Sequence, residues 1–179
     1  MDKVDTVTEE QKNNGEVVHT FSVIVDNEAG VLARVIGLFS GRGYNIESLT
    51  VAEIDADEKR SRITIVTSGT LMTIRQIRAQ LDRLVPVHSV ADLTEDGPSV
   101  ERELALIKVQ GSGEARVESL RIADIFRAHV VDSSNQSFVF EIVGSTEKLD
   151  AFIELMAPLG LIDIARTGVV AIARGPQGM

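Results

Sequence analysis

The same order of strand-like and helix-like periodicities occurs twice along this chain. Each copy is about 80 residues long and runs strand, helix, strand, strand, helix, strand. In the first copy we expect strands at 19–26, 45–55, 62–67 and 87–93, a helix at 30–42, and a second helix carrying Ile74, Ile77, Leu81 and Leu84. In the second copy we expect strands at 104–110, 130–133, 138–143 and 162–173, and helices at 115–128 and 148–159.

This order of elements restricts the fold to one common arrangement. A βαββαβ unit folds as a four-stranded antiparallel sheet with both helices on one face, which is the ferredoxin-like fold. We therefore predict an α+β protein with two tandem ferredoxin-like βαββαβ units, at residues 18–95 and 96–179, with a linker-like boundary near 94–99. The uncovered face and the edges of the first sheet are expected to pair with another copy or another chain.

The composition excludes several classes of function. The absence of cysteine excludes disulfides and thiolate zinc sites, and His19, His88 and His129 are too far apart in sequence to suggest a metal site. A net charge of -9 and 4% aromatic residues disfavour nucleic-acid binding. No apolar run approaches the roughly 18 residues that a membrane span needs, and no signal-peptide pattern is present, so we expect a cytoplasmic protein. Residues 1–17 are polar and aperiodic, which predicts a disordered leader.

The turn at 26–30, between the first strand and the first helix, has the properties of an anion-binding site. Free backbone N–H groups and the positive end of the helix dipole favour a carboxylate or a phosphate at such a helix start. Gly30 allows the backbone to approach a ligand closely, and the amide of Asn27 both donates and accepts hydrogen bonds. The turn is therefore a candidate ligand site.

A second polar turn follows the first helix. The glycines of the segment 41–43 are typical of a helix end, and Asn45 then opens the next strand. Because side chains alternate along a strand, Thr50 and Ala52 share one small, polar face, whereas Leu49 and Val51 point to the other face.

Residues 26–34 (DNEAGVLAR) resemble the first loop of ACT domains, which bind amino acids and regulate metabolic enzymes. The longer run formed by 34–40 and 42–52 is more specific and closely resembles the regulatory (small) subunit of acetolactate synthase, also called acetohydroxyacid synthase. The likeness covers about residues 18 to 176. It continues through 62–65, 80–85, 101–110, 125–127, 148–152, 166–170 and 174–175. The chain departs from the family in its acidic leader, at Glu147, and in the turn at 112–114.

The resemblance implies that the first unit is an ACT domain that binds valine, or a related branched-chain amino acid, at a dimer interface. The effector residues it implies are Asn27, Gly30, Val31, Asn45, Ile46, Thr50, Ala52 and Gln76. It further implies a chain without catalytic activity of its own that activates the large catalytic subunit of acetolactate synthase, a transferase, and confers feedback inhibition on it. That partner is expected to use thiamine diphosphate, Mg²⁺ and FAD, none of which should bind this chain.

Plainer interpretations and other functions stay open at this point. Asn27 and Gly30 also suit an ordinary turn, Thr50 and Ala52 ordinary strand packing, and Gln76 an exposed helix surface. An acylphosphatase-like enzyme shares the unit and an anion loop, although acidic residues within 26–30 oppose phosphate. The chain could also be a stand-alone amino-acid sensor that regulates another enzyme or transcription, although it lacks a basic stripe and a helix-turn-helix pattern.

Overall fold

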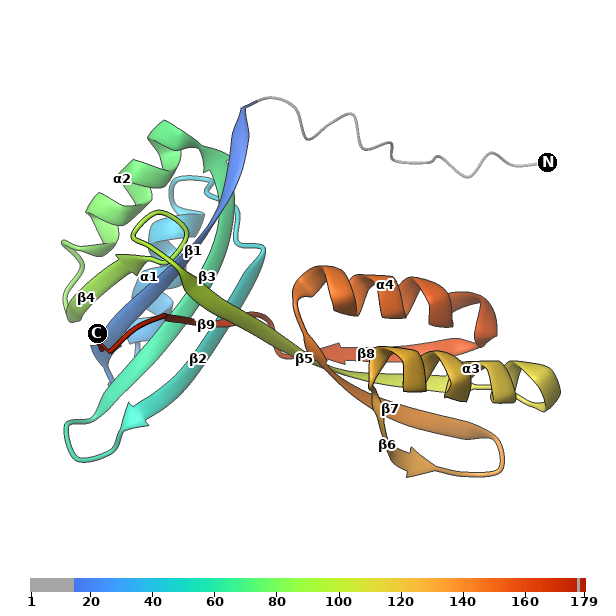
Figure 1. Cartoon of the computed structure of the whole chain (residues 1–179). Helices are drawn as coiled ribbons and strands as arrows, with labels where there is room; N and C mark the ends of the chain where they lie inside the picture. The colour runs from blue at the N-terminus through green and yellow to red at the C-terminus, as the bar shows by residue number, and fades with distance from the viewer. Residues whose placement is uncertain (1–14, 177) are drawn as a thin grey trace. The chain divides into compact units, whose positions relative to one another are not determined.

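The computed structural model describes residues 15–176 and 178–179. They form two compact units, and the boundary between the units along the chain lies between Gly97 and Pro98 (Figure 1). The predicted leader lies outside the described residues, apart from its last three positions. Each unit is described by itself below.

The first unit has the predicted order of elements. They are β1 (Glu16–Asp26), α1 (Val31–Ser40), β2 (Ser48–Asp55), β3 (Arg60–Thr70), α2 (Leu71–Leu81) and β4 (Val87–Asp92). The strands pair antiparallel in the order β2-β3-β1-β4, so β2 and β4 are the edges of the sheet.

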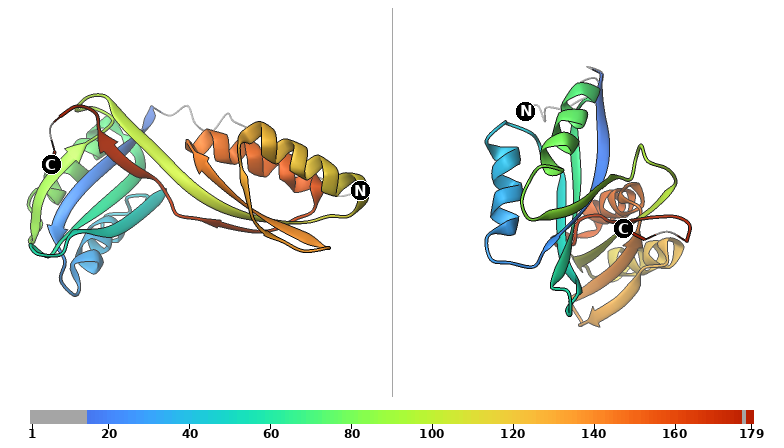
Figure 2. Two further views of the ribbon diagram at one scale, coloured as in Figure 1. Left: turned by 60° about the horizontal axis from the view of Figure 1, so that its bottom comes forward. Right: turned by 90° about the vertical axis from the view of Figure 1, so that its left-hand side faces the viewer.

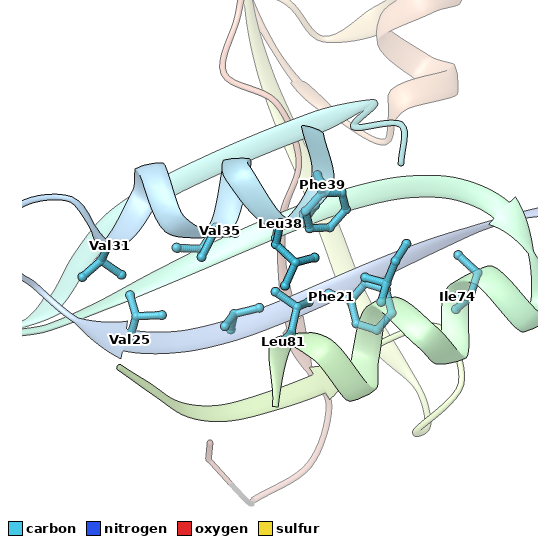
Figure 3. Packing of buried hydrophobic residues seen from close by; sticks show 12 residues of the cluster. Phe21, Val25, Val31, Val35, Leu38, Phe39, Ile74 and Leu81 are labelled. Atoms are coloured by element: carbon cyan, nitrogen blue, oxygen red, sulfur yellow. The ribbon is translucent and has the colours of Figure 1, made fainter. Parts of the chain in front are cut away.

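Both helices of this unit contribute to one core, which explains their spacing of apolar residues. Figure 3 shows the core side chains gathered between α1, α2 and the face of β1 that carries Phe21 and Val25. The labelled residues from the helices are Val31, Val35, Leu38, Phe39, Ile74 and Leu81, all of them buried. Burying side chains of this size contributes roughly 1.5–3 kcal/mol each, so the helical face of the sheet is fixed by packing.

Two boundaries in the first unit differ from the prediction. β1 begins at Glu16 rather than at position 19, because β3 is long enough to pair Glu16 with Thr70. β2 begins at Ser48 rather than at 45, because residues 41–47 form a loop that is held by local hydrogen bonds. In this loop the Tyr44 N–H donates to the Phe39 carbonyl at 3.0 Å, which turns the chain away from the helix axis.

The turn after β4 is closed by charged side chains. Arg78 on α2 donates two parallel hydrogen bonds to the carboxylate of Asp96, at 2.8 and 3.0 Å. These bonds from the guanidinium lower the pKa of Asp96 from its ordinary value, although desolvation opposes the shift. Asp92 accepts from the N–H groups of Thr94 and Glu95 in the same turn. The segment expected to be a linker is therefore partly ordered.

The second unit repeats the arrangement. Its elements are β5 (Ser99–Gln110), α3 (Gly113–Phe126), β6 (His129–Ser133), β7 (Ser137–Gly144), α4 (Thr146–Met156), the 3-10 turn η2 (Ala157–Leu159), β8 (Leu161–Arg166) and β9 (Val170–Ala173). The sheet order β6-β7-β5-β8 is equivalent to that of the first unit, with every pair antiparallel. Figure 2 shows α3 and α4 on the same face of this sheet. The predicted fold class, with two tandem ferredoxin-like units, is confirmed.

The last predicted strand, 162–173, was wrong in one respect, because the structure divides it into two. β8 pairs with Ala105–Val109 of β5, whereas β9 pairs with Ser99–Arg102 of the same strand. Gly168, at φ 81°, lies between them in a backbone region that favours glycine, and this interrupts the strand. Pairing with β9 also explains why β5 begins at Ser99, five positions before the expected start.

A buried ion pair fixes β8 beneath α4 in the second unit. The guanidinium of Arg166 donates to both carboxylate oxygens of Glu103 at 2.8 and 2.6 Å, and to Asp150 on α4 at 2.6 Å. Glu103 is only 5% exposed, so loss of Arg166 would leave a buried carboxylate without its cationic partner. The two carboxylates raise the pKa of Arg166 above its ordinary value.

Within the described residues, no helix is both long enough and apolar enough to cross a membrane.

Candidate functional site

The loop between β1 and α1 presents the start of a helix without a side-chain cap. Gly30 is the N-cap of α1 at φ 88° and ψ -7°, a left-handed conformation in which a residue other than glycine is strained. The Val31 N–H donates to the Glu28 carbonyl at 3.3 Å. In the described chain no side chain caps α1, and the first turn of α1 contains no acidic residue. The N–H groups of Leu32 and Ala33 are therefore available to an anion.

Two neighbouring segments hold this loop in place. The Asn27 N–H donates to the Lys59 carbonyl in the β2–β3 hairpin at 2.6 Å, and the Asp26 N–H donates to the Pro86 carbonyl at 3.2 Å. His88 Nε2 and Asp26 Oδ1 lie 2.5 Å apart. The backbone N–H of Asn27 is therefore used by the fold, whereas its exposed side chain faces away from the core.

His88 was not predicted as part of this site. The usable signal is topological: β4 runs antiparallel to β1, so a residue at the start of β4 lies beside the end of β1, where Asp26 is found. On α1, Arg34 Nη1 donates to the Val85 carbonyl at 3.1 Å. The segment 85–88, which leads into β4, therefore contacts both the loop and the helix that follows it.

The second candidate segment surrounds Asn45. Its side-chain Nδ2 donates to Glu47 at 2.5 Å and to Ser68 Oγ at 3.4 Å, while its backbone carbonyl accepts from Thr67 Oγ1 at 2.5 Å. Ile46 is half-buried and packs against the core of the unit. The polar side of this loop therefore faces solvent, and its apolar side is anchored.

The structure places these two candidate segments at opposite ends of the sheet within one chain. Asn45 contacts Thr67, which pairs with His19 near the start of β1, whereas the first loop follows Asp26 at the end of β1. The strand between His19 and Asp26 spans about 23 Å at roughly 3.3 Å per residue. A single amino acid is far too small to touch both segments of one chain.

Thr50 and Ala52 occupy the face of the sheet that the helices do not cover. Leu49 packs against the core and Val51 pairs with buried Ile63, so these two side chains point to the helical face and their neighbours point away from it. Thr50 is half-buried and Ala52 is exposed. Both residues lie on edge strand β2.

Gln76 is exposed on α2 and belongs to the Asn45 end of the unit. One helical turn later, Gln80 Nε2 donates to the hydroxyl of Tyr44 at 3.3 Å. The ring of Tyr44 packs edge-on against Phe39, with centroids 6.0 Å apart. Residues four positions apart share a helix face, so Gln76 is adjacent to the side of α2 that contacts the loop at 41–47.

The sequences of both units match families of known proteins. Residues 21–89 match the family described as AHAS small subunit-like ACT domain, and residues 102–175 match the family described as small subunit of acetolactate synthase. The probable acetolactate synthase small subunit of Archaeoglobus fulgidus is 48% identical over 157 residues, covering 88% of this chain and 97% of the relative. The acetolactate synthase isozyme 3 small subunit of Escherichia coli is 45% identical, covering 88% and 96%.

A solved structure extends the likeness to three dimensions. The crystal structure of the acetolactate synthase small subunit from Thermotoga maritima matches with a TM-score of 0.80 and 39% identity, covering 90% of this chain and 99% of that chain. The chain belongs to the acetolactate synthase small-subunit family. The resemblance seen in the sequence is thereby confirmed, and it makes this chain a regulatory subunit of acetolactate synthase that carries an ACT domain. The family name implies a role in branched-chain amino acid biosynthesis.

The two units of this family member are not equivalent at the candidate site. Val23 of β1 and Ile107 of β5 are buried at equivalent positions of the two sheets. When the units are aligned on these two residues, Gly111 corresponds to Asn27 and Glu114 corresponds to Gly30. Glu114 lies in the first turn of α3, where its charge opposes an anion.

The second polar loop is also reduced in the second unit. Residues 127–128 connect α3 to β6, whereas residues 41–47 make the same connection in the first unit. The second unit therefore has the fold without either half of the candidate ligand site.

No metal centre accompanies the candidate site in the described part of the chain. Among these residues, no group of three His, Asp or Glu side chains is placed to hold a metal ion. His19 instead bonds the buried carboxylate of Asp92 at 2.7 Å. His88 bonds the loop, as described above.

Proposed function

We propose that this regulatory subunit activates the catalytic subunit of acetolactate synthase and makes it subject to inhibition by valine or a related branched-chain amino acid. The effector binds between the ACT domains of two copies of the chain. The observation that carries this proposal is the separation of the two polar loops, since only a second copy can complete the site.

The edge of the first sheet supports this pairing. β2 is an edge strand, and the helical side of this edge exposes three apolar side chains: Leu32 at 37%, Ile36 at 38% and Val51 at 41%. Antiparallel pairing of β2 with the same strand of a second copy extends the sheet and covers these side chains.

The same pairing also brings the two loops together. The end of β2, at Asp55, lies on the same side of the unit as the β1–α1 loop, because Asp26 and Asp55 both pair with Arg60. Antiparallel pairing places this end beside the start of β2 in the other copy, where the loop of Asn45 is found. A symmetric dimer therefore holds two composite sites.

The chemistry of the composite site suits an α-amino acid. The effector carboxylate accepts from the free N–H groups of the first turn of α1, which begins at Val31. Because Nδ2 of Asn45 donates to Glu47, the amide oxygen of Asn45 is left to accept from the effector ammonium, together with the amide oxygen of Asn27. A small apolar side chain then lies against Ile46.

The remaining predicted positions have indirect roles in this proposal. Thr50 and Ala52 lie on the interface strand, on the face away from the helices, so bulkier side chains there alter how two β2 strands meet. Gln76 acts through the side of α2 that contacts the loop at 41–47.

Inhibition requires that the effector bind one arrangement of the dimer more tightly than another, because equal affinity shifts no equilibrium. A site shared between two copies meets this requirement, since any movement of one copy against the other changes its geometry. Thiamine diphosphate, Mg²⁺ and FAD belong, in this proposal, to the catalytic partner, and both subunits work in the cytoplasm.

Isothermal titration calorimetry tests the proposal directly. Valine, leucine and isoleucine are each titrated into the chain, with and without the catalytic subunit, and the activity of the complex is followed in parallel. We expect saturable binding of at least one of them, near one molecule per chain, and a matching loss of activity. Absence of binding by all three, with the activation of the catalytic subunit intact, would reject the effector role.

A further inference from the structure

A hollow of about 340 Å³ in the second unit is lined by two cations and two apolar side chains. It lies between the end of α3 and the first turn of α4, and its lining residues are Ile125, Phe126, Arg127 and Lys148. Pockets that hold small ligands begin at about this volume, and they combine apolar walls with a few polar groups. The two cations are the polar groups here, and no acidic residue of the described chain lines the hollow.

The ammonium group of Lys148 is held in place by its surroundings. Its Nζ donates to the Val143 carbonyl at 3.0 Å, which leaves two N–H groups of the ammonium for another acceptor. The stem of this lysine crosses Gly144, where an added Cβ would lie 2.5 Å from Cδ of Lys148. The glycine therefore provides the space in which the ammonium group is placed.

Arg127 occupies a backbone position that is unfavourable for arginine. It is the C-cap of α3 at φ 56° and ψ 40°, in the left-handed region that glycine adopts far more easily. A cation anywhere in the last turn of a helix interacts favourably with the C-terminal end, so this interaction does not require arginine at the C-cap. Backbone strain of this kind is concentrated at ligand sites, where a particular side chain is needed.

The first unit builds the same corner without either cation. Thr73 follows the N-cap of α2 by three positions, as Lys148 follows the N-cap of α4, and in both cases the N–H donates to the N-cap side chain. A Cβ at Gly69 would lie 3.1 Å from Cγ2 of Thr73, so the glycine before the helix has the same role in both units. The C-cap of α1 is Gly41, whereas that of α3 is Arg127. The fold therefore requires neither cation.

Neither cation is neutralised within the part of the chain that the structure describes. The ion pairs found there include neither Arg127 nor Lys148. The carboxylate of Glu147, which precedes Lys148, accepts hydrogen bonds from its own backbone N–H and from Ser145, and these bonds lower its pKa. Two cations without an acidic partner beside one hollow, in a chain with a net charge of -9, favour an anion from outside the chain.

We propose that this hollow binds a small organic anion in which a carboxylate or phosphate group lies next to an apolar group. Arg127 and Lys148 donate to the anionic oxygens, and the apolar part lies against Phe126 and Ile125. An amino acid is not the expected ligand, because its ammonium group would lie beside two cations without an acidic acceptor in the lining. The second unit thus binds a different class of ligand from the first, and the inference does not depend on effector binding by the first unit.

Nuclear magnetic resonance of the isotope-labelled full chain identifies the class of ligand. The probes are α-ketoisovalerate, which carries a carboxylate, phenyl phosphate, which carries a phosphate, and valine, which has the carbon skeleton of α-ketoisovalerate with an ammonium group. We expect saturable shifts of the backbone signals of residues 125–128 and 144–149 with at least one of the two anions, and none there with valine. Absence of such shifts with both anions at millimolar concentrations would overturn the proposal.

Two variants and a matched control test the assigned residues. Lys148→Thr introduces the residue that the first unit has at this place, and Arg127→Gly removes the charge together with the backbone strain. We expect each to bind the anion about tenfold more weakly, and Arg127→Gly to melt at a higher temperature than the unmodified chain. Arg121→Gln also removes one positive charge from α3, where Arg121 forms an exposed ion pair with Glu118, and it should bind the anion normally.

Three results with these variants would contradict the proposal. Unchanged anion binding in Lys148→Thr and Arg127→Gly would show that the hollow is not the site. An equal loss in Arg121→Gln would mean that only the overall charge matters. A lower melting temperature in Arg127→Gly would show that the fold needs this arginine for its own stability.

These outcomes are separable from those of the effector proposal. Valine binding by the unmodified chain without binding of either anion would reject this second site alone. Anion binding at the hollow, with no binding of valine, leucine or isoleucine, would reject the effector role alone. Weaker association of both variants with the catalytic subunit, with neither anion bound, would indicate that the hollow receives an acidic segment of that subunit and would overturn the assignment to a small anion.

Discussion

Replacing Gly30 with aspartate tests the carboxylate end of the proposed site. The backbone at Gly30 has φ 88°, and a Cβ added there meets no atom within 4 Å, so a side chain fits but is strained. The strain of a residue other than glycine in this region is roughly 1–2 kcal/mol, and asparagine tolerates it best. Gly30→Asn is therefore a matched control, because it has almost the shape of aspartate without the charge.

The expected effect follows from the distance between two negative charges. A carboxylate at position 30 lies about 4–5 Å from an effector carboxylate bound to the first turn of α1, which gives about 3–4 kcal/mol of repulsion at an effective dielectric constant near 20. The site is open to solvent, so we reduce this to about 2 kcal/mol. That corresponds to roughly thirtyfold weaker binding for Gly30→Asp, against a few-fold at most for Gly30→Asn.

Calorimetric titration with valine and inhibition of the reconstituted enzyme measure this difference. We expect Gly30→Asp to abolish inhibition at valine concentrations that inhibit the unmodified complex, while activation of the catalytic subunit is largely retained. Full valine sensitivity in Gly30→Asp would show that the effector carboxylate binds elsewhere. Equal losses in the two variants would mean that backbone strain, rather than charge, is responsible.

Three further predictions concern the contacts that support the fold and the loop. Arg166→Met leaves buried Glu103 without its partner and should reduce the free energy of unfolding by about 2–4 kcal/mol, measured by chemical denaturation. Because Arg78 lowers the pKa of Asp96, their pair stabilises the fold above the ordinary pKa of a carboxyl group and stops doing so as the pH falls through the lowered value. Arg78→Met should therefore be less stable than the unmodified chain at neutral pH, and its stability should fall less steeply as the pH is lowered. Thermal unfolding at a series of pH values measures both effects, and an unchanged dependence on pH would show that the pair does not stabilise the fold. His88→Ala removes the bond to the β1–α1 loop and should weaken valine binding about three- to tenfold without loss of activation, and unchanged calorimetry would show that the loop holds its shape unaided.

The sequence was sufficient to predict the order of elements, because apolar periodicity reports directly on burial. Phe21, Val23 and Val25 alternate on one face of a strand, and the helices cover that face, as expected. The ends of strands depend instead on the length of the neighbouring strand, which a local pattern does not contain. For this reason β1 and β5 extend further than predicted, and the break at Gly168 was missed.

The sequence singled out the candidate residues one by one, but it did not contain their arrangement in space. In sequence, Gly30 and Asn45 belong to one short stretch, yet α1 lies between them and carries the chain back along the sheet by about 15 Å. Only the strand pairing shows that the two loops are at opposite ends of the unit. The brace formed by His88 was missed for the same reason, since it depends on the antiparallel pairing of β1 with β4.

The most direct test of the shared effector site mixes two defective chains. Gly30→Asp damages one half of the site and Asn45→Ala damages the other, so each variant alone should bind valine much more weakly than the unmodified chain. In a dimer of one chain of each kind, one composite site combines the intact Asn45 of the first variant with the intact Gly30 of the second. Random mixing should therefore restore about a quarter of the valine binding of the unmodified chain, measured by calorimetry. No recovery from chains shown to exchange partners would contradict a site built from two copies.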